Sequence, residues 1–149
     1  MPPPLPSPVP VVLDTNVVLD LWVFEDATVR RLATALESGR VTAWADEGTL
    51  RELELVLAYP SFGLDAAARR RVLGTYRGLV RVAPEAPEVP LPTLPRCRDR
   101  DDQKFLVLAA RVGAAWLVSK DKRVLSMADR HGLPFIILSP RQVAERLAY

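Results

Sequence analysis

Short apolar runs alternate with longer segments of helical spacing, and this alternation constrains the fold more than any other feature of the chain. The runs span residues 9–13, 41–45, 115–118 and 135–138. Apolar runs of this length are typical of strands buried on both faces, as in a parallel sheet. Segments that alternate with such strands cover both faces of the sheet as helices. The pattern predicts an α/β fold, with a central parallel sheet between two helical layers.

The segments between the runs carry the start and stop signals of helices. Helical spacing extends over residues 17–24, 27–37, 47–57, 65–79, 101–112 and 122–131, and Ser139-Pro140 begins a terminal helix. Asp46 and Asp65 are residues that can cap a helix, and glycines that can end one follow several of these segments. A further short strand is predicted over residues 80–83. The proline-rich residues 84–95 predict a loop that is too short to separate two domains.

Length and terminal composition predict one domain that does not bind membranes. The chain has 149 residues, and its first ten are MPPPLPSPVP. We expect a proline-rich tail over residues 1–8 and a single domain over residues 9–149. No apolar stretch approaches the roughly 20 residues of a membrane helix, and the N-terminus lacks the basic and apolar parts of a secretion signal. The expected location is the cytoplasm.

The contents of cysteine and histidine restrict the kind of metal site that the chain can build. Cys97 is the only cysteine and His131 the only histidine. An intramolecular disulfide, a cysteine-rich zinc site and a histidine-cluster site are therefore excluded. A metal bound here must be a hard cation held by carboxylates and water.

Acidic residues fall where the ends of the predicted strands meet. Asp14 follows the run 9–13, and Asp121 follows the run 115–118. Asp102 opens the helix before the latter run, where Asp99 and Asp101 offer alternatives, and Glu52 lies in the helix after the second run. Because the carboxyl ends of parallel strands meet at one edge of a sheet, these carboxylates are expected to gather there. Carboxylates so close repel one another, and Mg²⁺ or Mn²⁺ would compensate this repulsion and activate a water against a phosphodiester. Asn16 and Ser119 stand beside two of the acids and are candidates to orient them.

At these residues the chain resembles the PIN-domain nucleases, and most closely the VapC-like branch of toxins from toxin–antitoxin modules. The segments that carry the resemblance are VVLDTNVVL at 11–19, TLRELELVL at 49–57, CRDRDDQKFLVLA at 97–109 and LVSKDKRVL at 117–125. The resemblance implies a PIN-like α/β/α sandwich that hydrolyses RNA with Mg²⁺ or Mn²⁺. The implied catalytic and metal-binding residues are Asp14, Glu52, Asp102 and Asp121, supported by Thr15, Asn16, Asp99, Asp101 and Ser119. The toxin branch further implies a cognate antitoxin partner and a possible homodimer.

Basic residues flank the acidic segments, within a chain of net charge +2. The candidates for contacts with RNA phosphates are Arg98, Arg100, Lys104, Lys120, Lys122 and Arg123. Three residues of these segments depart from the family pattern. Gln103 stands where relatives often have aspartate or asparagine, Lys120 where they often have glycine, and Arg123 where they often have aspartate. These departures motivate an alternative, in which the chain is a non-catalytic PIN-fold module that binds RNA or protein.

Other interpretations of the acids remain open at this level. Asp14 and Asp121 are also suited to capping the helices that follow them, and Glu52 to lying on a solvated helix face. Asp46 stands where a phosphoacceptor signalling domain needs an aspartate, but no acid pair accompanies Asp14. A haloacid-dehalogenase-like phosphatase needs a second aspartate where Asn16 stands. The joint pattern of four acids at strand ends favours the nuclease over these classes.

Overall fold

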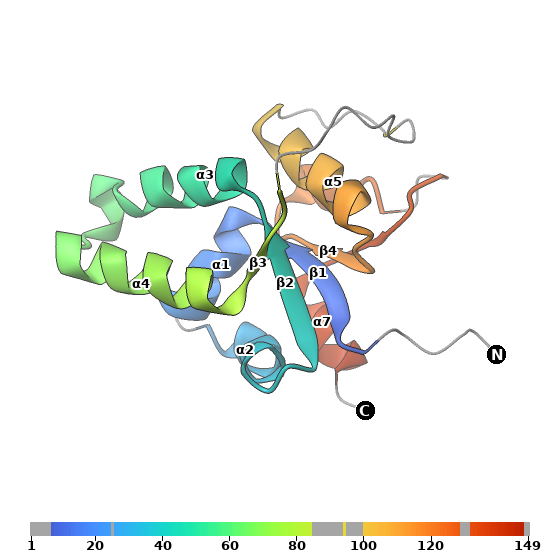
Figure 1. The fold of residues 1–149 in the computed structure, drawn as a ribbon, viewed down its shortest axis with the longest axis horizontal. Helices are drawn as coiled ribbons and strands as arrows, with labels where there is room; N and C mark the ends of the chain where they lie inside the picture. Colours follow the sequence, from blue (N-terminus) through green and yellow to red (C-terminus); the bar gives the residue numbers. More distant parts are fainter. Residues whose placement is uncertain (1–6, 25, 85–93, 95–99, 129–131, 148–149) are drawn as a thin grey trace.

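A parallel sheet of five strands forms the centre of the molecule (Figure 1). The computed structural model describes residues 7–24, 26–84, 94, 100–128 and 132–147, with the backbone alone at positions 100 and 101. The strands are β1 Val9–Leu13, β2 Val41–Ala45, β3 Arg81–Val82, β4 Trp116–Val118 and β5 Ile136–Leu138. They lie in the order β3-β2-β1-β4-β5, and every pairing is parallel. The α/β architecture predicted from the apolar runs is confirmed.

The strand order reverses at β1, and this reversal determines where a site can form. From β1 the chain adds β2 and β3 on one side, then returns to add β4 and β5 on the other. The helices that follow β1 and β2 therefore lie on one face of the sheet, and the short helix directly after β4 lies on the other. In open parallel sheets, ligands bind in the crevice at this point, beyond the carboxyl ends of the strands. Asp14 and Ser119, the residues directly after β1 and β4, stand at that crevice.

Seven α-helices and two short 3₁₀ helices occur in the part of the chain that the structure describes. They are α1 Thr15–Trp22, η1 Ala27–Val29, α2 Arg30–Glu37, α3 Glu47–Leu57, η2 Pro60–Phe62, α4 Ala66–Leu79, α5 Arg100–Val112, α6 Lys122–Leu125 and α7 Pro140–Arg146. None of these helices has both the length and the apolar composition needed to span a bilayer.

Two helix predictions differ from the structure. The segment 27–37 is divided into η1 and α2, because the Asp26 side chain accepts a hydrogen bond from the Thr28 amide and begins a separate 3₁₀ turn. The helix expected over 122–131 ends at Leu125. There the Ser126 hydroxyl donates to the Arg123 carbonyl at 2.7 Å, a local bond that competes with continuation of the helix. Residues 129–131 lie outside the described part.

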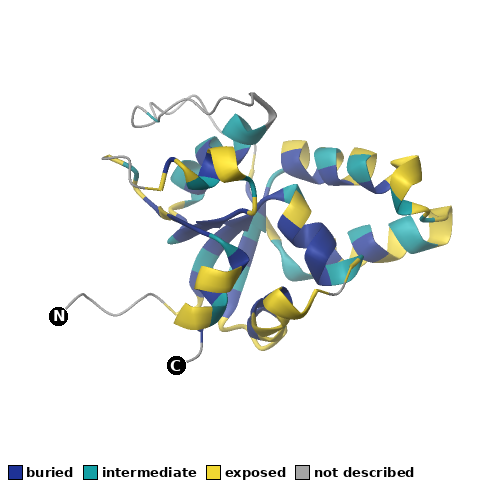
Figure 2. Ribbon diagram, turned by 180° about the vertical axis from the view of Figure 1, so that it is seen from behind, coloured by how far each residue is buried: buried dark blue, intermediate teal, exposed yellow. Residues whose placement is uncertain are grey.

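Alternate residues of β1, β2, β4 and β5 face two separate hydrophobic cores. Val11, Trp116 and Leu138 pack with the layer that contains α1, α2, α3, α4 and α7. Val12 and Leu117 pack with α5 and α6 on the other face. Figure 2 shows the consequence, with buried strands at the centre and exposed residues on the outer faces of the helices. Burial on both faces explains why the strands are continuous apolar runs.

Helices α3 and α4 run side by side as an arm that extends away from the sheet (Figure 1). The arm is fixed at its base, where the Tyr76 ring on α4 packs on the Trp22 ring of α1 with centroids 5.5 Å apart. Tyr76 and Val72 are the buried side chains of α4. The short helix η2 joins the two arm helices at the outer end.

Candidate active site

Asp14 is a buried carboxylate that is held from both sides. Asp14 is 4% exposed and lies at the junction of β1 and α1. One carboxylate oxygen, Oδ1, accepts a hydrogen bond from the Val17 amide at 3.1 Å and so caps α1. The other oxygen, Oδ2, accepts one from the Ser119 hydroxyl. Asp14 therefore caps α1 and also lies at the edge of the sheet, so the two interpretations of this residue are both correct.

Ser119 connects two of the candidate acids at the end of β4. It is fully buried, and its hydroxyl donates to Asp14 while accepting a hydrogen bond from the Asp121 amide at 3.0 Å. The Asp121 carboxylate in turn accepts from the Arg123 amide at 2.8 Å and caps α6. One hydroxyl thus fixes the ends of two neighbouring strands relative to each other.

Glu52 reaches the same region from the middle of α3. Its Oε2 accepts a hydrogen bond from the Thr15 hydroxyl at 2.6 Å, and its Oε1 lies 2.6 Å from the Lys104 ammonium of α5. The Glu52 side chain is 21% exposed, so the alternative interpretation, a solvated position on the helix face, is not what the structure shows. Contacts to α1 and to α5 hold this carboxylate between the two helical layers.

The four candidate acids line one pocket of about 200 Å³. Its polar wall contains Asp14, Thr15, Asn16, Glu52, Asp102 and Asp121, which come from α1, α3, α5 and the loop after β4. Residues 95–99, which include Arg98 and Asp99, lie outside the described part, and only the backbone is described at Arg100 and Asp101. Four distant segments of the chain thus meet at the reversal of the strand order.

Burial and like charge act together on Asp14. Burial raises the pKa of the Asp14 carboxyl above 3.8, its ordinary value, and the negative charge of Asp121 raises it further. The hydrogen bonds from Ser119 and Val17 act in the opposite direction but do not cancel this rise. A carboxylate in such surroundings is stabilised by a nearby cation.

The chemistry of the pocket fits a hard divalent cation, although its acids are not drawn tightly together. Carboxylate oxygens are the donors that Mg²⁺ and Mn²⁺ prefer, and these ions keep several waters that fill the space between ligands. Among the described residues, no three acids, histidines or cysteines converge closely enough to enclose an ion. The Lys104 ammonium, which contacts Glu52, supplies one positive charge to the pocket.

Comparison with known protein families agrees with the observed fold. A family model described as PIN domain matches residues 10–123, most of the chain.

The chain belongs to the PIN domain family.

PIN domains are in general nucleases, and they usually use divalent metal ions. The resemblance predicted from the sequence is therefore confirmed at the level of the family. A search of curated proteins gave no match.

The basic residues expected to contact RNA occupy two kinds of position in this PIN domain. Lys122 and Arg123 are exposed on α6, beside Asp121. Lys104 contacts Glu52, one of the residues that line the pocket, and Lys120 forms an ion pair of 2.8 Å with the buried Asp20 of α1. The lysine at position 120, a departure from the family pattern, thus links the loop after β4 to α1.

Aromatic residues form part of the pocket that the sequence did not reveal. Tyr59, Phe62 and Phe105 line it together with Val56. Phe105 lies on α5 at a buried position, whereas Tyr59 precedes η2 and Phe62 ends it, at the outer end of the arm. The available signal was the segment YPSFG, in which two aromatic residues surround a proline just beyond a helix end.

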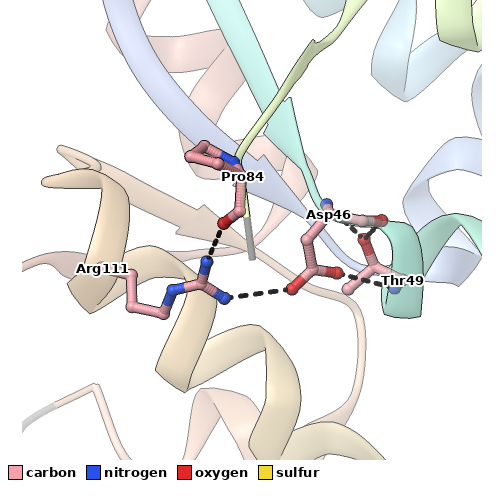
Figure 3. Close-up of polar contacts among 4 residues, drawn as sticks. All are labelled: Asp46, Thr49, Pro84 and Arg111. Atoms are coloured by element: carbon pink, nitrogen blue, oxygen red, sulfur yellow. Dashed lines mark hydrogen bonds and ion pairs between the residues drawn. The ribbon is translucent and has the colours of Figure 1, made fainter. Parts of the chain in front are cut away.

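Asp46, the only acid directly after β2, lies outside the pocket. Its side chain accepts from the Thr49 amide at 2.8 Å in a capping box at the start of α3 (Figure 3). Its other oxygen lies 3.5 Å from the Arg111 guanidinium, which also donates to the Pro84 carbonyl at 2.6 Å. The residue that a phosphoacceptor domain would use is therefore a structural link between β2, α3 and α5.

Replacing Asp46 with alanine is expected to lower the free energy of unfolding by about 1–2 kcal/mol, because the cap of α3 is lost and Arg111 loses its carboxylate partner. Asp65→Ala is the matched control, since Asp65 caps α4 at an exposed position through the Ala68 amide. The loss is expected to be larger for Asp46→Ala than for the control when both are unfolded with urea. Equal losses would show that the contact with Arg111 contributes nothing.

Proposed function

We propose that this PIN domain is a metal-dependent endoribonuclease that hydrolyses phosphodiester bonds of RNA in the cytoplasm, and that residues 9–149 act as one domain. The observation that carries the proposal is the pocket itself. Carboxylates from four separate segments line it at the reversal of the strand order, where parallel sheets bind their ligands. Repulsion among these charges favours a site that is completed by a divalent cation.

Asp14, Glu52, Asp102 and Asp121 are the residues that we propose as ligands. Mg²⁺ or Mn²⁺, when bound there, supplies charge stabilisation for the phosphodiester and a water of lowered pKa. Ser119 holds Asp14 in place through its hydroxyl, and Thr15 does the same for Glu52. The Lys104 ammonium offsets one negative charge and so lowers the repulsion between the pocket and a phosphate.

Cleavage of single-stranded RNA by the purified protein tests this function. We expect cutting with Mn²⁺ or Mg²⁺, none in excess EDTA, and recovery when the metal is restored. Cleavage that persists in EDTA would contradict the metal-dependent mechanism. A preparation without cutting at any tested metal concentration would contradict the enzyme assignment.

A non-catalytic module that binds RNA or protein is the second candidate. The observation that favours it is the Lys104–Glu52 ion pair, which places a cation of the protein itself on one of the proposed ligands. Titration calorimetry distinguishes the two functions. Saturable binding of Mn²⁺ supports the nuclease, and heat indistinguishable from dilution at millimolar Mn²⁺ supports the module.

The proposed biological role is that of the toxin in a toxin–antitoxin pair. Its support is the resemblance of the four acidic segments to the VapC-like branch. Induced expression of the protein is expected to arrest growth, whereas expression of Asp14→Asn is not. A cognate antitoxin would relieve the arrest by blocking the acidic pocket, and light scattering of the purified protein tests for the homodimer.

A further inference from the structure

Three aromatic rings form a continuous cluster on the surface of the arm. Tyr59 and Phe62 lie nearly parallel, with centroids 6.2 Å apart and an interplanar angle of 14°. Phe24, two residues beyond the end of α1, meets Phe62 edge-on at 5.7 Å. Phe24 is 55% exposed and Tyr59 52% exposed, so both rings present large faces to solvent. We call Phe24, Tyr59 and Phe62 the aromatic platform.

The backbone holds the aromatic platform in a fixed geometry. Pro60 begins η2, and Gly63 ends it with a positive φ of 62°, a conformation that glycine adopts without strain. The Tyr59 amide donates to the Val56 carbonyl at 3.0 Å, and the Phe62 amide donates to the Tyr59 carbonyl at 3.1 Å. Rings carried by such a turn lose little conformational entropy when a ligand stacks on them.

The aromatic platform is continuous with the acidic pocket. Tyr59 and Phe62 line the same pocket as the four acids. Tyr59 is seven positions after Glu52 and two beyond the end of α3, and at about 1.5 Å per helical residue this places the platform roughly 10 Å from Glu52 along the direction of α3. A phosphodiester at the acids would therefore direct its neighbouring nucleotides toward the rings.

We propose that the aromatic platform stacks an unpaired nucleobase of the substrate, next to the nucleotide whose phosphate lies at the acids. The proposal rests on the proposed function for the identity of the substrate as RNA. Tyrosine and phenylalanine rings bind any base through its π face, without reading its hydrogen-bonding groups. Bases inside a duplex already stack on their neighbours, whereas unpaired bases are free to do so. The platform therefore selects single-stranded substrates with little sequence preference.

Binding of two fluorescein-labelled oligonucleotides tests this inference by fluorescence anisotropy. One is a single-stranded RNA of eight uridines, and the other has the same backbone with abasic sites in place of the bases. Measurements in EDTA prevent metal-dependent cutting, and a parallel series contains Mn²⁺. The ratio of the two dissociation constants isolates the contribution of the bases from that of the phosphates.

Wild-type protein is expected to bind the uridine oligonucleotide about 5- to 100-fold more tightly than the abasic one. Tyr59→Leu keeps an apolar side chain but removes the ring, and should reduce this ratio severalfold, whereas Tyr59→Phe should preserve it. Leu55→Ala is the matched control on α3, because Leu55 is 63% exposed and lines a different pocket. Its ratio should equal that of the wild type.

The outcomes separate the aromatic platform from the proposed nuclease. Equal affinity for the two oligonucleotides in the wild type, with or without Mn²⁺, would overturn the inference even if the protein cuts RNA. The rings would then be better explained as a docking surface for a protein. An unchanged ratio in Tyr59→Leu would overturn it as well. Base-dependent binding without cleavage would support the platform and contradict the nuclease.

Discussion

Replacing Asp14 with asparagine is expected to abolish RNA cleavage while the protein remains folded. Loss of a residue that only orients a metal ligand typically costs 10- to 100-fold in activity, so loss of a ligand itself should cost more than about 100-fold. The fold should persist because an amide oxygen can still accept the hydrogen bond from Val17 that caps α1. Initial rates with Mn²⁺ on single-stranded RNA measure the first effect, and circular dichroism checks the second.

The same substitution is expected to raise the melting temperature at neutral pH in metal-free buffer. The pKa of Asp14 is higher in the folded protein than its value of 3.8 in the unfolded chain. The stability of the folded protein therefore falls as the pH rises from 3.8 through the pKa of the folded state. A neutral asparagine lacks this dependence. The two proteins should therefore differ least in strong acid, while Asp14→Asn melts higher at pH 7, by about 2–4 °C for each 1 kcal/mol relieved.

Asp65→Asn is the matched control, because it changes an exposed N-cap outside the pocket. Cleavage and the pH dependence of its melting curve should match those of the wild type. A melting temperature of Asp14→Asn that falls as far as that of a core truncation would show that the loss of activity reflects unfolding. Cleavage by Asp14→Asn at the wild-type rate would remove Asp14 from the proposed site.

Ser119→Ala is expected to reduce cleavage by about 10- to 100-fold, the usual effect of removing a group that orients a metal ligand. It should also lower the free energy of unfolding by about 1–3 kcal/mol, because a buried carboxylate loses its hydrogen-bond donor. The Asp121 amide loses its acceptor in the same change. Stability and activity are thus expected to fall together, unlike in Asp14→Asn.

Comparison with two further serine variants separates positioning from general destabilisation. Ser38→Ala removes a hydroxyl that bonds to the Ala35 carbonyl at the end of α2, away from the pocket, and should leave cleavage unchanged. Ser119→Thr keeps the hydroxyl and should retain most of the activity. In a double-mutant cycle, Ser119→Ala should cost less stability in the Asp14→Asn background than in the wild type. Additive effects would argue against the link between the two residues.

The parts of the fold that were predictable from the sequence depend on local patterns. The runs 9–13 and 41–45 are strands as expected, since burial on both faces demands continuous apolar residues. The meeting of Asp14 and Asp121 at one pocket follows from their places after strands on either side of the reversal. The short α6 was not predictable from periodicity alone, because a single serine hydroxyl competes with the helix at its end.

The contacts that were not predictable join residues distant in the sequence. The Lys104–Glu52 and Lys120–Asp20 ion pairs depend on the register of α5 and the loop after β4 against α3 and α1, which no local pattern encodes. The aromatic platform is of the same kind, since Phe24 and Phe62 meet only when the arm packs on α1. The assignments of Arg98 and Asp99 fall on residues outside the described part and remain predictions.

Because the arm carries only one end of the pocket, the two ends differ in how easily they move. Asp14 and Ser119 are anchored in the middle of the sheet, where opening requires the whole domain to unfold. The outer end is carried by a helical hairpin in which α4 buries only Val72 and Tyr76, so the hairpin can shift as a unit at a lower free energy while the turn that carries the rings keeps its shape. Under the proposed function, RNA strands of different bulk would be admitted by small movements of one wall, while the proposed metal ligands keep their alignment.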